Sequence, residues 1–237
     1  MSNTVDIVIP VYNEGKNIIS TFDSLYKNIS HKFNIIICFD FEDDDTLITI
    51  ENSKYKNFKN IFFKKNKSIG PHSAVMTGIL TSNADYVIVI PADDDYNSAI
   101  VEKMIDISIK EKYDVFCPSR FTNGGTMEGT FFLKKVLVVT ANFLLKHLAK
   151  MPVHDCTNGF RLFSRNVIDN IIIESSFGFT YSIEYLVKAH RFGFKIGEIP
   201  ALWKERKYGK SRFQILKWIF PYLRWFIYAF LSRINIK

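Results

Sequence analysis

The sequence lacks several features that mark whole classes of protein. Its 237 residues include three cysteines, Cys38, Cys117 and Cys156, which are odd in number and far apart. This usage fits reduced thiols in a cytosolic compartment and argues against a disulfide framework or a zinc site. The first residues carry no basic stretch followed by an apolar one, so no secretory signal is expected. Repeats, low-complexity tracts and long linkers are also absent.

A long uncharged apolar run is missing too, although one segment comes close. Residues 213–231 read FQILKWIFPYLRWFIYAFL, and Lys217, Pro221 and Arg224 interrupt the roughly 20 apolar residues that a spanning helix needs. Polar positions recur every three or four residues, which predicts an amphipathic helix. Its tryptophans and tyrosine favour the membrane interface. We therefore expect a helix lying in the membrane interface, with packing on the protein's own core or a subunit contact as the alternatives.

Charge is distributed unevenly along the chain. The whole sequence carries a net charge of +7, but residues 188–237 hold 12 lysines and arginines against two glutamates, a net charge of +10. Residues 1–187 are near neutral, at −3. Such asymmetry indicates nucleic acid or an anionic membrane as a partner. The bulky apolar residues of the tail and the lack of a nucleic-acid motif favour the membrane, so we expect no nucleic-acid partner.

The composition, 47% hydrophobic and 23% charged, is that of a globular protein with one substantial core. Short β-branched runs alternate with helical patterns through about residue 120, which predicts an α/β domain whose mainly parallel sheet is flanked by helices. We assign residues 1–212 to this domain and residues 213–237 to a membrane-associating tail. The predicted strands are 5–10, 33–39, 60–64, 86–90, 115–118, 159–164 and 195–200, and the predicted helices are 14–30, 45–53, 73–82, 99–111, 130–149 and 180–192.

Three adjacent carboxylates, Asp93, Asp94 and Asp95, directly follow the predicted strand 86–90. Open α/β sheets bind their ligands at this end of the strands. The like charges repel one another, and a hard cation such as Mg²⁺ or Mn²⁺ would relieve the repulsion and also bind a diphosphate. On an extended segment the side chains of Asp93 and Asp95 would point the same way. A solvated acidic turn is the alternative, because an acidic triplet alone is a weak motif.

Five segments in order resemble one family. They are IPVYNE at 9–14, an acidic turn after the second strand, the carboxylates at 91–95, CTNGFRLFSR at 156–165 and ERKYGKSRF at 205–213. Together they resemble the family 2 glycosyltransferases, and most of all the dolichol-phosphate mannose synthase-like branch of polyprenyl-phosphate sugar synthases. The resemblance covers essentially the whole chain. It implies a GT-A fold that is Rossmann-like, a UDP- or GDP-sugar donor, Mg²⁺ or Mn²⁺ as cofactor, and inversion at the anomeric carbon.

For the donor, the resemblance implies a site built from several loops. Tyr12 and Glu14 would lie near the base and ribose, although an acidic residue is also favoured in the first turn of a helix. Asp40 would accept from a base N–H, while Asp43 to Asp45 are interpreted as helix-capping and solvated charge. Pro91 replaces the usual first aspartate, so Asp93 and Asp95 are expected to hold the metal. The implied donor-binding residues are Pro10, Tyr12, Glu14, Asp40, Gly70, Asp93, Arg206, Ser211 and Arg212. Of these, Arg206, Ser211 and Arg212 would bind the diphosphate.

For the acceptor, the resemblance implies residues in the second half. Arg120 would grip the acceptor phosphate, because a guanidinium matches phosphate with two N–H groups. Lys134 and Lys135 would help, with ordinary snorkelling as the alternative. Asp155 would be a general base for a hydroxyl acceptor but would order the acceptor loop for a phosphate acceptor. The implied acceptor-binding residues are Arg120, Lys134, Lys135, Asn158 and Arg161, and the implied catalytic residues are Asp93, Asp95, Arg120 and Asp155.

The sequence thus leads us to expect a metal-dependent inverting glycosyltransferase at the cytoplasmic face of a membrane, peripheral or monotopic. It would move a sugar from a UDP- or GDP-sugar to a polyprenyl phosphate, dolichyl or undecaprenyl. One alternative is a transferase acting on a sugar hydroxyl of a glycan or glycolipid, with Asp155 as the base. The other is a non-catalytic nucleotide-binding module that docks on a membrane, which the presence of Pro91 leaves open.

Overall fold

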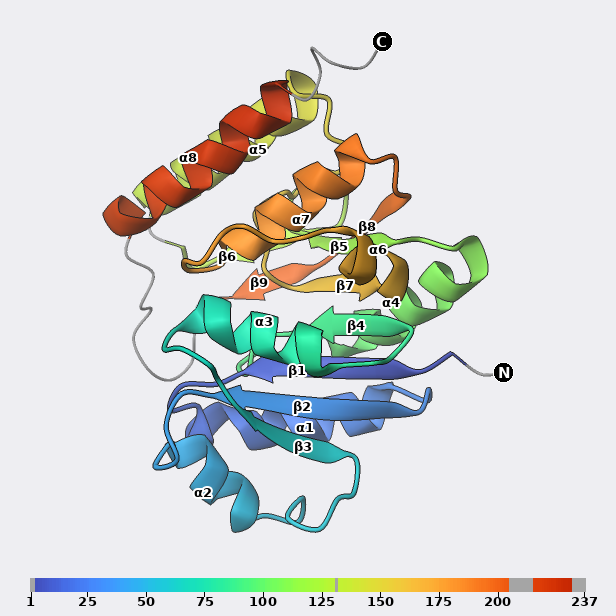
Figure 1. Ribbon diagram of the computed structural model, residues 1–237, viewed down its shortest axis with the longest axis vertical. Helices are drawn as coiled ribbons and strands as arrows, with labels where there is room; N and C mark the ends of the chain where they lie inside the picture. The colour runs from blue at the N-terminus through green and yellow to red at the C-terminus, as the bar shows by residue number, and fades with distance from the viewer. Residues whose placement is uncertain (1–2, 131, 205–214, 232–237) are drawn as a thin grey trace.

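The computed structural model describes residues 3–130, 132–204 and 215–231, with the backbone alone for residues 215–219. These residues form helices and strands in a layered arrangement (Figure 1). The strands are β1 (Val5–Pro10), β2 (Phe33–Phe39), β3 (Ile61–Lys65), β4 (Tyr86–Val89), β5 (Val115–Ser119), β6 (Thr126–Glu128), β7 (Arg161–Ser164), β8 (Ile196–Pro200) and β9 (Leu202–Lys204). The helices are α1 (Gly15–Asn28), α2 (Asp45–Glu51), α3 (Pro71–Thr81), α4 (Ser98–Glu111), α5 (Phe132–His147), α6 (Arg165–Asn170), α7 (Thr180–Arg191) and α8 (Ile215–Leu231).

In the part of the chain that the structure describes, the central sheet has seven strands in the order β3-β2-β1-β4-β7-β5-β8. β1 lies between β2 and β4 and is parallel to both, with Val5 opposite Phe33 and Tyr86. It is buried on both faces, because Val8 belongs to the apolar cluster on one side of the sheet and Ile7 to the cluster on the other. A strand that is buried on both faces has to be largely apolar, which is why these strands appear in the sequence as apolar runs. The parallel pairing of β1 with β2 and β4 confirms the predicted parallel sheet in the first half.

The second half departs from the parallel arrangement. β7 runs antiparallel to both of its neighbours, β4 and β5. The sequence predicted this strand but not its direction, because a short apolar run does not reveal which way a buried strand points. A second sheet pairs β6 with β9 in parallel, with Met127 opposite Trp203. Neither strand was predicted, since three residues are too few to show a periodic pattern.

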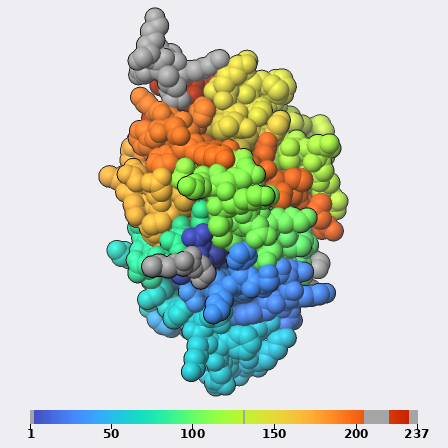
Figure 2. Space-filling view, turned by 90° about the vertical axis from the view of Figure 1, so that its right-hand side faces the viewer, coloured from blue at the N-terminus to red at the C-terminus, as the bar shows by residue number. Residues whose placement is uncertain are grey.

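Helices cover both faces of the central sheet, as predicted. α1 and α4 pack on one face through a cluster that includes Phe22 and Met104. α3, α7 and α8 contribute to the cluster on the other face, through residues such as Val75, Leu186 and Trp225. α5 and α8 lie side by side in an outer layer above α7 (Figure 1). Seen from the right of that view, the first half of the chain fills the lower part of the molecule and the second half the upper part (Figure 2).

The helices begin and end within two residues of the predicted positions, except for the six-residue α6, which was not predicted. α8 has two kinds of apolar surface: Trp225 and Ala229 are buried, whereas Phe220 and Ile227 are exposed. The helix therefore packs on the protein's own core, one of the alternatives, and also keeps an exposed apolar edge. Among the described residues, no helix combines the length and the hydropathy needed to cross a membrane.

Candidate active site

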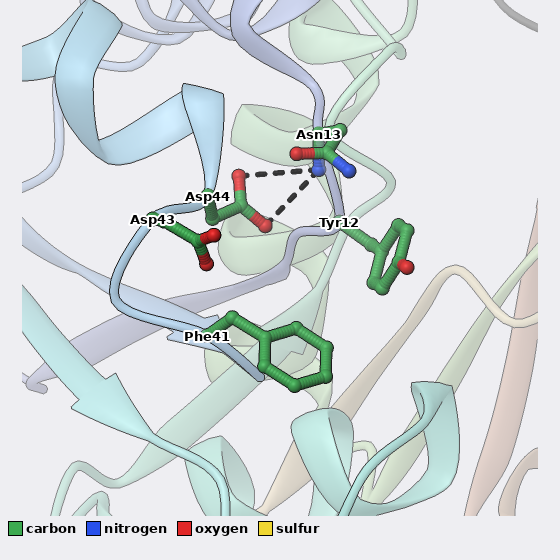
Figure 3. A pocket seen from close by; sticks show the side chains of 5 residues that line it. All are labelled: Tyr12, Asn13, Phe41, Asp43 and Asp44. Atoms are coloured by element: carbon green, nitrogen blue, oxygen red, sulfur yellow. Dashed lines mark hydrogen bonds between the residues drawn. The ribbon is translucent and has the colours of Figure 1, made fainter.

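A hollow of about 300 Å³ lies where β1 and β2 end. Its lining comes from the two loops that follow these strands (Figure 3). Because parallel neighbours end at the same edge of a sheet, residues about 30 positions apart meet there. The lining residues are Tyr12, Asn13, Phe41, Asp43 and Asp44.

Asp44 holds the two loops together. Its carboxylate accepts from the backbone N–H of Asn13, at 3.0 and 3.1 Å, and from that of Thr46, at 2.9 Å, where it caps α2. Asn13 has a φ of 53°, a left-handed conformation that asparagine tolerates better than most residues. The Thr46 hydroxyl in turn accepts from Glu14 N–H at 2.9 Å. The predicted capping role of Asp44 is confirmed, but its side chain is buried rather than solvated.

Two aromatic rings stand at the open side of the hollow. Tyr12 and Phe41 are about 40% exposed, with ring centroids 6.3 Å apart and planes at 77° (Figure 3). Exposed rings beside carboxylates suit a planar heterocycle that carries N–H donors, because a base stacks on aromatic faces. The sequence reasoning placed Tyr12 here but missed Phe41 and Asn13. The signal that was available for Phe41 is its position directly after Asp40, at the end of a predicted strand.

Asp40 organises the loop before α3. Its carboxylate accepts from Asn66 Nδ2 at 2.8 Å and from the Gly70 N–H at 3.1 and 3.2 Å. Gly70 has a φ of 114°, which side chains disfavour, so glycine is required at this turn. Asp40 thus ties β2 to the start of α3, and its predicted bond to a base N–H stays a prediction.

Glu14 and Pro10 occupy the end of the same loop. Pro10 is the last residue of β1, paired with Cys38. Glu14 is buried at the start of α1, and its carboxylate accepts from Asn17 Nδ2 at 2.8 Å. The predicted contacts of these residues with base and ribose stay predictions.

The acidic run forms a turn and not an extended segment. Asp94 N–H donates to the Pro91 carbonyl at 3.3 Å, so the alternation argument that placed Asp93 and Asp95 side by side does not apply. Asp94 is 5% exposed and accepts from Asn97 N–H and from Asn97 Nδ2, at 3.0 and 2.8 Å. Burial raises the pKa of Asp94 to about 7, and the charge of Asp93 adds to the shift. Asp93 and Asp95 are partly exposed.

This turn fits the divalent cation that the resemblance implies. Asp93 and Asp95 offer hard oxygen donors that solvent reaches, while Asn97 holds Asp94 away in the interior. Two carboxylates leave positions for water and phosphate oxygens, which is how Mg²⁺ sites are usually completed. The donor types therefore suit Mg²⁺ or Mn²⁺, and binding of the cation by Asp93 and Asp95 stays a prediction.

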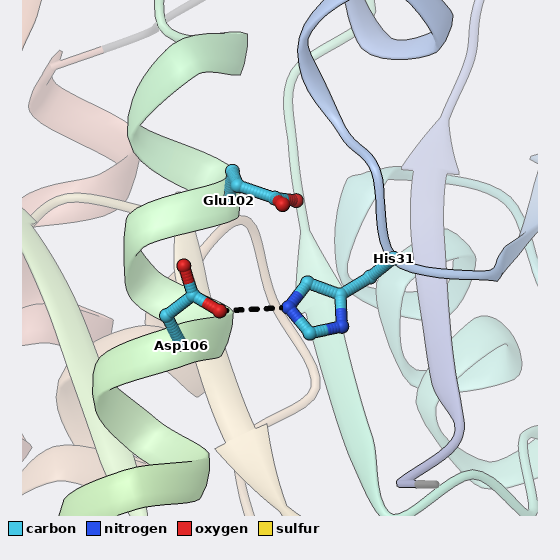
Figure 4. Close-up of side chains that lie close together, drawn as sticks. All are labelled: His31, Glu102 and Asp106. Carbon is cyan, nitrogen blue, oxygen red and sulfur yellow. Dashed lines mark hydrogen bonds and ion pairs between the residues drawn. The ribbon is translucent and has the colours of Figure 1, made fainter.

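Another group of metal-capable side chains lies at the opposite edge of the sheet. Among the described residues, His31, Glu102 and Asp106 are the group whose donor atoms lie within 4.8 Å of one another (Figure 4). Asp106 pairs with His31 Nε2 at 2.8 Å, and Glu102 accepts from the N–H and hydroxyl of Ser30. His31 precedes β2, whereas the acidic turn follows β4, so the two groups are at opposite ends of parallel strands.

Arg120 and Asp155 form a buried ion pair. Arg120 Nε lies 2.7 Å from Asp155 Oδ2, and Nη2 lies 2.9 Å from Oδ1. Asp155 is fully buried and also accepts from the N–H groups of Arg120, Thr157 and Asn158. Burial alone would raise the pKa of Asp155, but the charge and hydrogen bonds of Arg120 hold it below its ordinary value. The carboxylate is thus a fixed anchor of the 155–158 loop.

The remaining acceptor residues differ in exposure. Arg161 is fully buried, and donates to the carbonyls of Asn158 and Asp155. The Arg161 guanidinium thus holds the 155–158 loop from inside the protein, and its predicted contact with an acceptor stays a prediction. Asn158 Nδ2 donates to the Pro118 carbonyl at 3.0 Å.

The two lysines of α5 also differ. Lys134 Nζ lies 5.1 Å from the centre of the Trp203 ring, an arrangement typical of a cation–π contact, and Lys135 is exposed. Their predicted contact with an acceptor stays a prediction. Arg206, Ser211 and Arg212, the predicted diphosphate clamp, lie outside the described residues.

Comparisons with known proteins agree with this arrangement. The model of the glycosyl transferase family 2 matches residues 6–172. The chain belongs to glycosyl transferase family 2. It is 26% identical over 228 residues to a dolichol-phosphate mannosyltransferase of Pyrococcus furiosus, which covers 93% of this chain and 62% of the relative. It is 23% identical to a polyprenol monophosphomannose synthase of Mycolicibacterium smegmatis, over 87% of this chain and 79% of the relative.

Solved structures identify the fold. The glucosyl-3-phosphoglycerate synthase of Mycobacterium tuberculosis, in complex with Mn²⁺, UDP and phosphoglyceric acid, superimposes with a TM-score of 0.71 at 18% identity. The match covers all of this chain and 80% of the other. The α/β fold of this family 2 chain is therefore the GT-A fold, as expected from the sequence.

Proposed function

We propose that this family 2 chain transfers a sugar from a nucleotide sugar to a polyprenyl phosphate. Two relatives, a dolichol-phosphate mannosyltransferase and a polyprenol monophosphomannose synthase, support this substrate class. The observation that carries the choice of acceptor is the buried pair of Arg120 and Asp155. This pair bears directly on whether the acceptor needs a general base.

A hydroxyl acceptor requires a base, whereas a phosphate acceptor is already an anion. Asp155 is buried, its carboxylate accepts from three backbone N–H groups and one guanidinium, and its pKa is lowered. Such a carboxylate is a poor proton acceptor and is not exposed to a substrate. In the proposed reaction an acceptor phosphate oxygen bonds to the anomeric carbon as the bond from that carbon to the nucleotide diphosphate breaks.

The donor would occupy the edge of the sheet between the hollow and the acidic turn. The rings of Tyr12 and Phe41 would flank the base, UDP or GDP, and Asp93 and Asp95 would hold Mg²⁺ or Mn²⁺. The cation, when bound, would neutralise charge on the leaving diphosphate. Positioning and electrostatics would supply most of the acceleration. Arg206, Ser211 and Arg212 remain the proposed clamp on that diphosphate.

A membrane surface would bring the lipid acceptor to the site. α5 and α8 expose large apolar side chains, among them Phe132 at 78%, Phe143 at 59% and Phe220 at 76%. Adjacent helices with this much exposed apolar surface suit the membrane interface, and the net charge of +10 over residues 188–237 suits anionic lipids. We therefore propose peripheral or monotopic binding at the cytoplasmic face, with residues 213–237 as the membrane-associating tail of the 1–212 domain.

The test is nucleotide binding, followed by transfer. Binding of UDP, GDP and CDP is measured with and without Mn²⁺ on the wild type, on Asp93→Ala/Asp95→Ala, and on Asp106→Ala as an exposed control at the other edge. We expect Mn²⁺-dependent binding of one nucleotide that the double variant loses and the control keeps. Absence of binding by folded wild type would overturn the proposed donor site and leave a non-catalytic, membrane-docking role.

The acceptor is then tested with two lipids that differ in one group. A labelled nucleotide sugar is offered with polyprenyl phosphate or with the matching polyprenol. We expect label only in the phosphate product. Label in the polyprenol, rising with pH, would overturn the phosphate acceptor in favour of a hydroxyl acceptor.

A further inference from the structure

Asn97 connects the acidic turn to a distant strand. Its Nδ2 donates to Asp94 Oδ2 and to the Leu202 carbonyl, both at 2.8 Å, and its Oδ1 accepts from Leu202 N–H at 3.1 Å. The side chain is 3% exposed, so each of its polar groups is matched inside the protein. Leu202 begins β9, which is more than 100 residues away in the sequence.

These contacts do not serve the ordinary purpose of an asparagine at this position. Asn97 is the N-cap residue of α4, where an asparagine side chain usually accepts from a backbone N–H of the first turn. The Asn97 side chain makes no such capping bond. Its oxygen accepts from Leu202 N–H instead. The Asn97 side chain therefore connects the acidic turn to β9 and leaves the first turn of α4 without a side-chain cap.

Tyr96 makes a second connection between the same two segments. Lys204 N–H donates to the Tyr96 hydroxyl at 3.2 Å, and Lys204 Nζ lies 5.9 Å from the centre of the Tyr96 ring. Asp93 and Asp95 are thus connected through adjacent residues to the first and last residues of β9.

We propose that Asn97 is a positioning residue that fixes the metal-binding turn relative to β9, and so sets the distance from Asp93 and Asp95 to Lys204, the last residue of that strand. A diphosphate that bridges a cation and a basic side chain needs both at a set separation. The base, by contrast, is bound by the loops of Tyr12 and Phe41, which Asn97 does not contact. This inference rests on the proposed donor site and adds a residue that its motifs do not include.

The test compares two ligands that differ only in the diphosphate. Affinities for the preferred nucleoside and its diphosphate are measured with Mn²⁺ for the wild type and Asn97→Ala, and Mn²⁺ binding is measured alone. Asn60→Ala is the control, because the Asn60 side chain likewise bonds to two other segments, through Tyr26 and Phe33, away from the acidic turn. Circular dichroism checks that each variant is folded.

We expect Asn97→Ala to weaken diphosphate binding by about tenfold or more, while nucleoside binding changes less than about twofold. Asn60→Ala should change neither. Unchanged diphosphate binding, or an equal loss for both ligands, would overturn the positioning role. A wild type that binds the nucleoside but not the diphosphate, or binds neither, would overturn the proposed donor site and this inference with it.

A second variant covers the case in which Asn97→Ala does not fold. Tyr96→Phe removes the hydroxyl that accepts from Lys204 and keeps the ring. We expect a loss of diphosphate affinity of about three- to tenfold, with nucleoside affinity retained. Equal affinities for both ligands in Tyr96→Phe and wild type would count against the proposal.

Discussion

Two buried carboxylates, Asp94 and Asp155, are held by neighbouring donors instead of facing the solvent. Their environments differ: Asn97 gives Asp94 neutral donors, and Arg120 gives Asp155 a full opposite charge. The pKa of Asp94 is accordingly raised and that of Asp155 lowered. Two aspartates that look alike in the sequence therefore have pKa values shifted in opposite directions.

Asp155→Asn should destabilise the protein by about 3–5 kcal/mol, because it leaves Arg120 buried without its opposite charge. Urea unfolding at pH 7 measures the change. Asp106→Asn, which affects an exposed pair with His31, is the control and should change stability by less than about 1 kcal/mol. Similar stabilities for Asp155→Asn and wild type would show that the buried pair contributes little.

The same difference should depend on pH. Because the pKa of Asp155 is lower in the folded protein, the unfolded state binds the proton first as the pH falls. The stabilisation is therefore present in full above the ordinary aspartate pKa and is lost as the pH falls toward the folded value. When urea unfolding is repeated between pH 7 and pH 3, the stabilities of the wild type and Asp155→Asn should converge in acid. A difference in stability that stays constant with pH would contradict a lowered pKa for Asp155.

Residue types at strand ends could be read from the sequence, but their partners could not. The sequence placed Tyr12, Asp40 and the acidic run at one edge of the sheet, since each follows a buried strand. It did not indicate that Asn97 would bond to Leu202, because that contact depends on a three-residue strand with no periodic pattern. It likewise gave no sign that Arg120 is paired internally.

At the scale of elements, α3 approaches the sheet closely through one glycine. A Cβ on Gly78 would lie 2.9 Å from Val8 Cγ2 and 3.0 Å from Cys38 Sγ, closer than packed atoms allow. α3 therefore needs a residue without a side chain at this position. Because α3 begins directly after Gly70, the packing of α3 on β1 and β2 also fixes the turn at Gly70 that Asp40 holds.

Gly78→Ala should lower stability by about 1–3 kcal/mol, despite alanine's better helix propensity, because the added methyl group overpacks the interface. Thermal unfolding measures the loss as a lower Tm. Thr81→Ala, on the exposed last turn of the same helix, is the control that keeps the propensity effect without the overpacking. A higher Tm for Gly78→Ala would mean that the sheet yields to the methyl group.

At the scale of the whole molecule, the exposed apolar side chains are concentrated on the outer layer of α5 and α8. Phe132→Asp/Phe220→Asp should lower affinity for anionic lipid vesicles by about tenfold or more, since each phenylalanine contributes about 1.5–3 kcal/mol when buried. Vesicle flotation gives the measurement. Phe62→Asp is the control, because Phe62 is 45% exposed on β3, remote from these helices. Equal losses in all variants would mean that the α5 and α8 layer is not the lipid-binding face.

The order of strands also dictates when the active site forms during synthesis. The adjacent strands β3, β2, β1 and β4 come from residues 5–89, so they are available to pair before the rest of the chain is synthesised. The acidic turn gains its partners on β9 only after residue 204 has emerged. A ribosome-bound chain would therefore carry the Tyr12 and Phe41 loops before the acidic turn has its partners on β9, so the two parts of the proposed donor site would come together only late in synthesis.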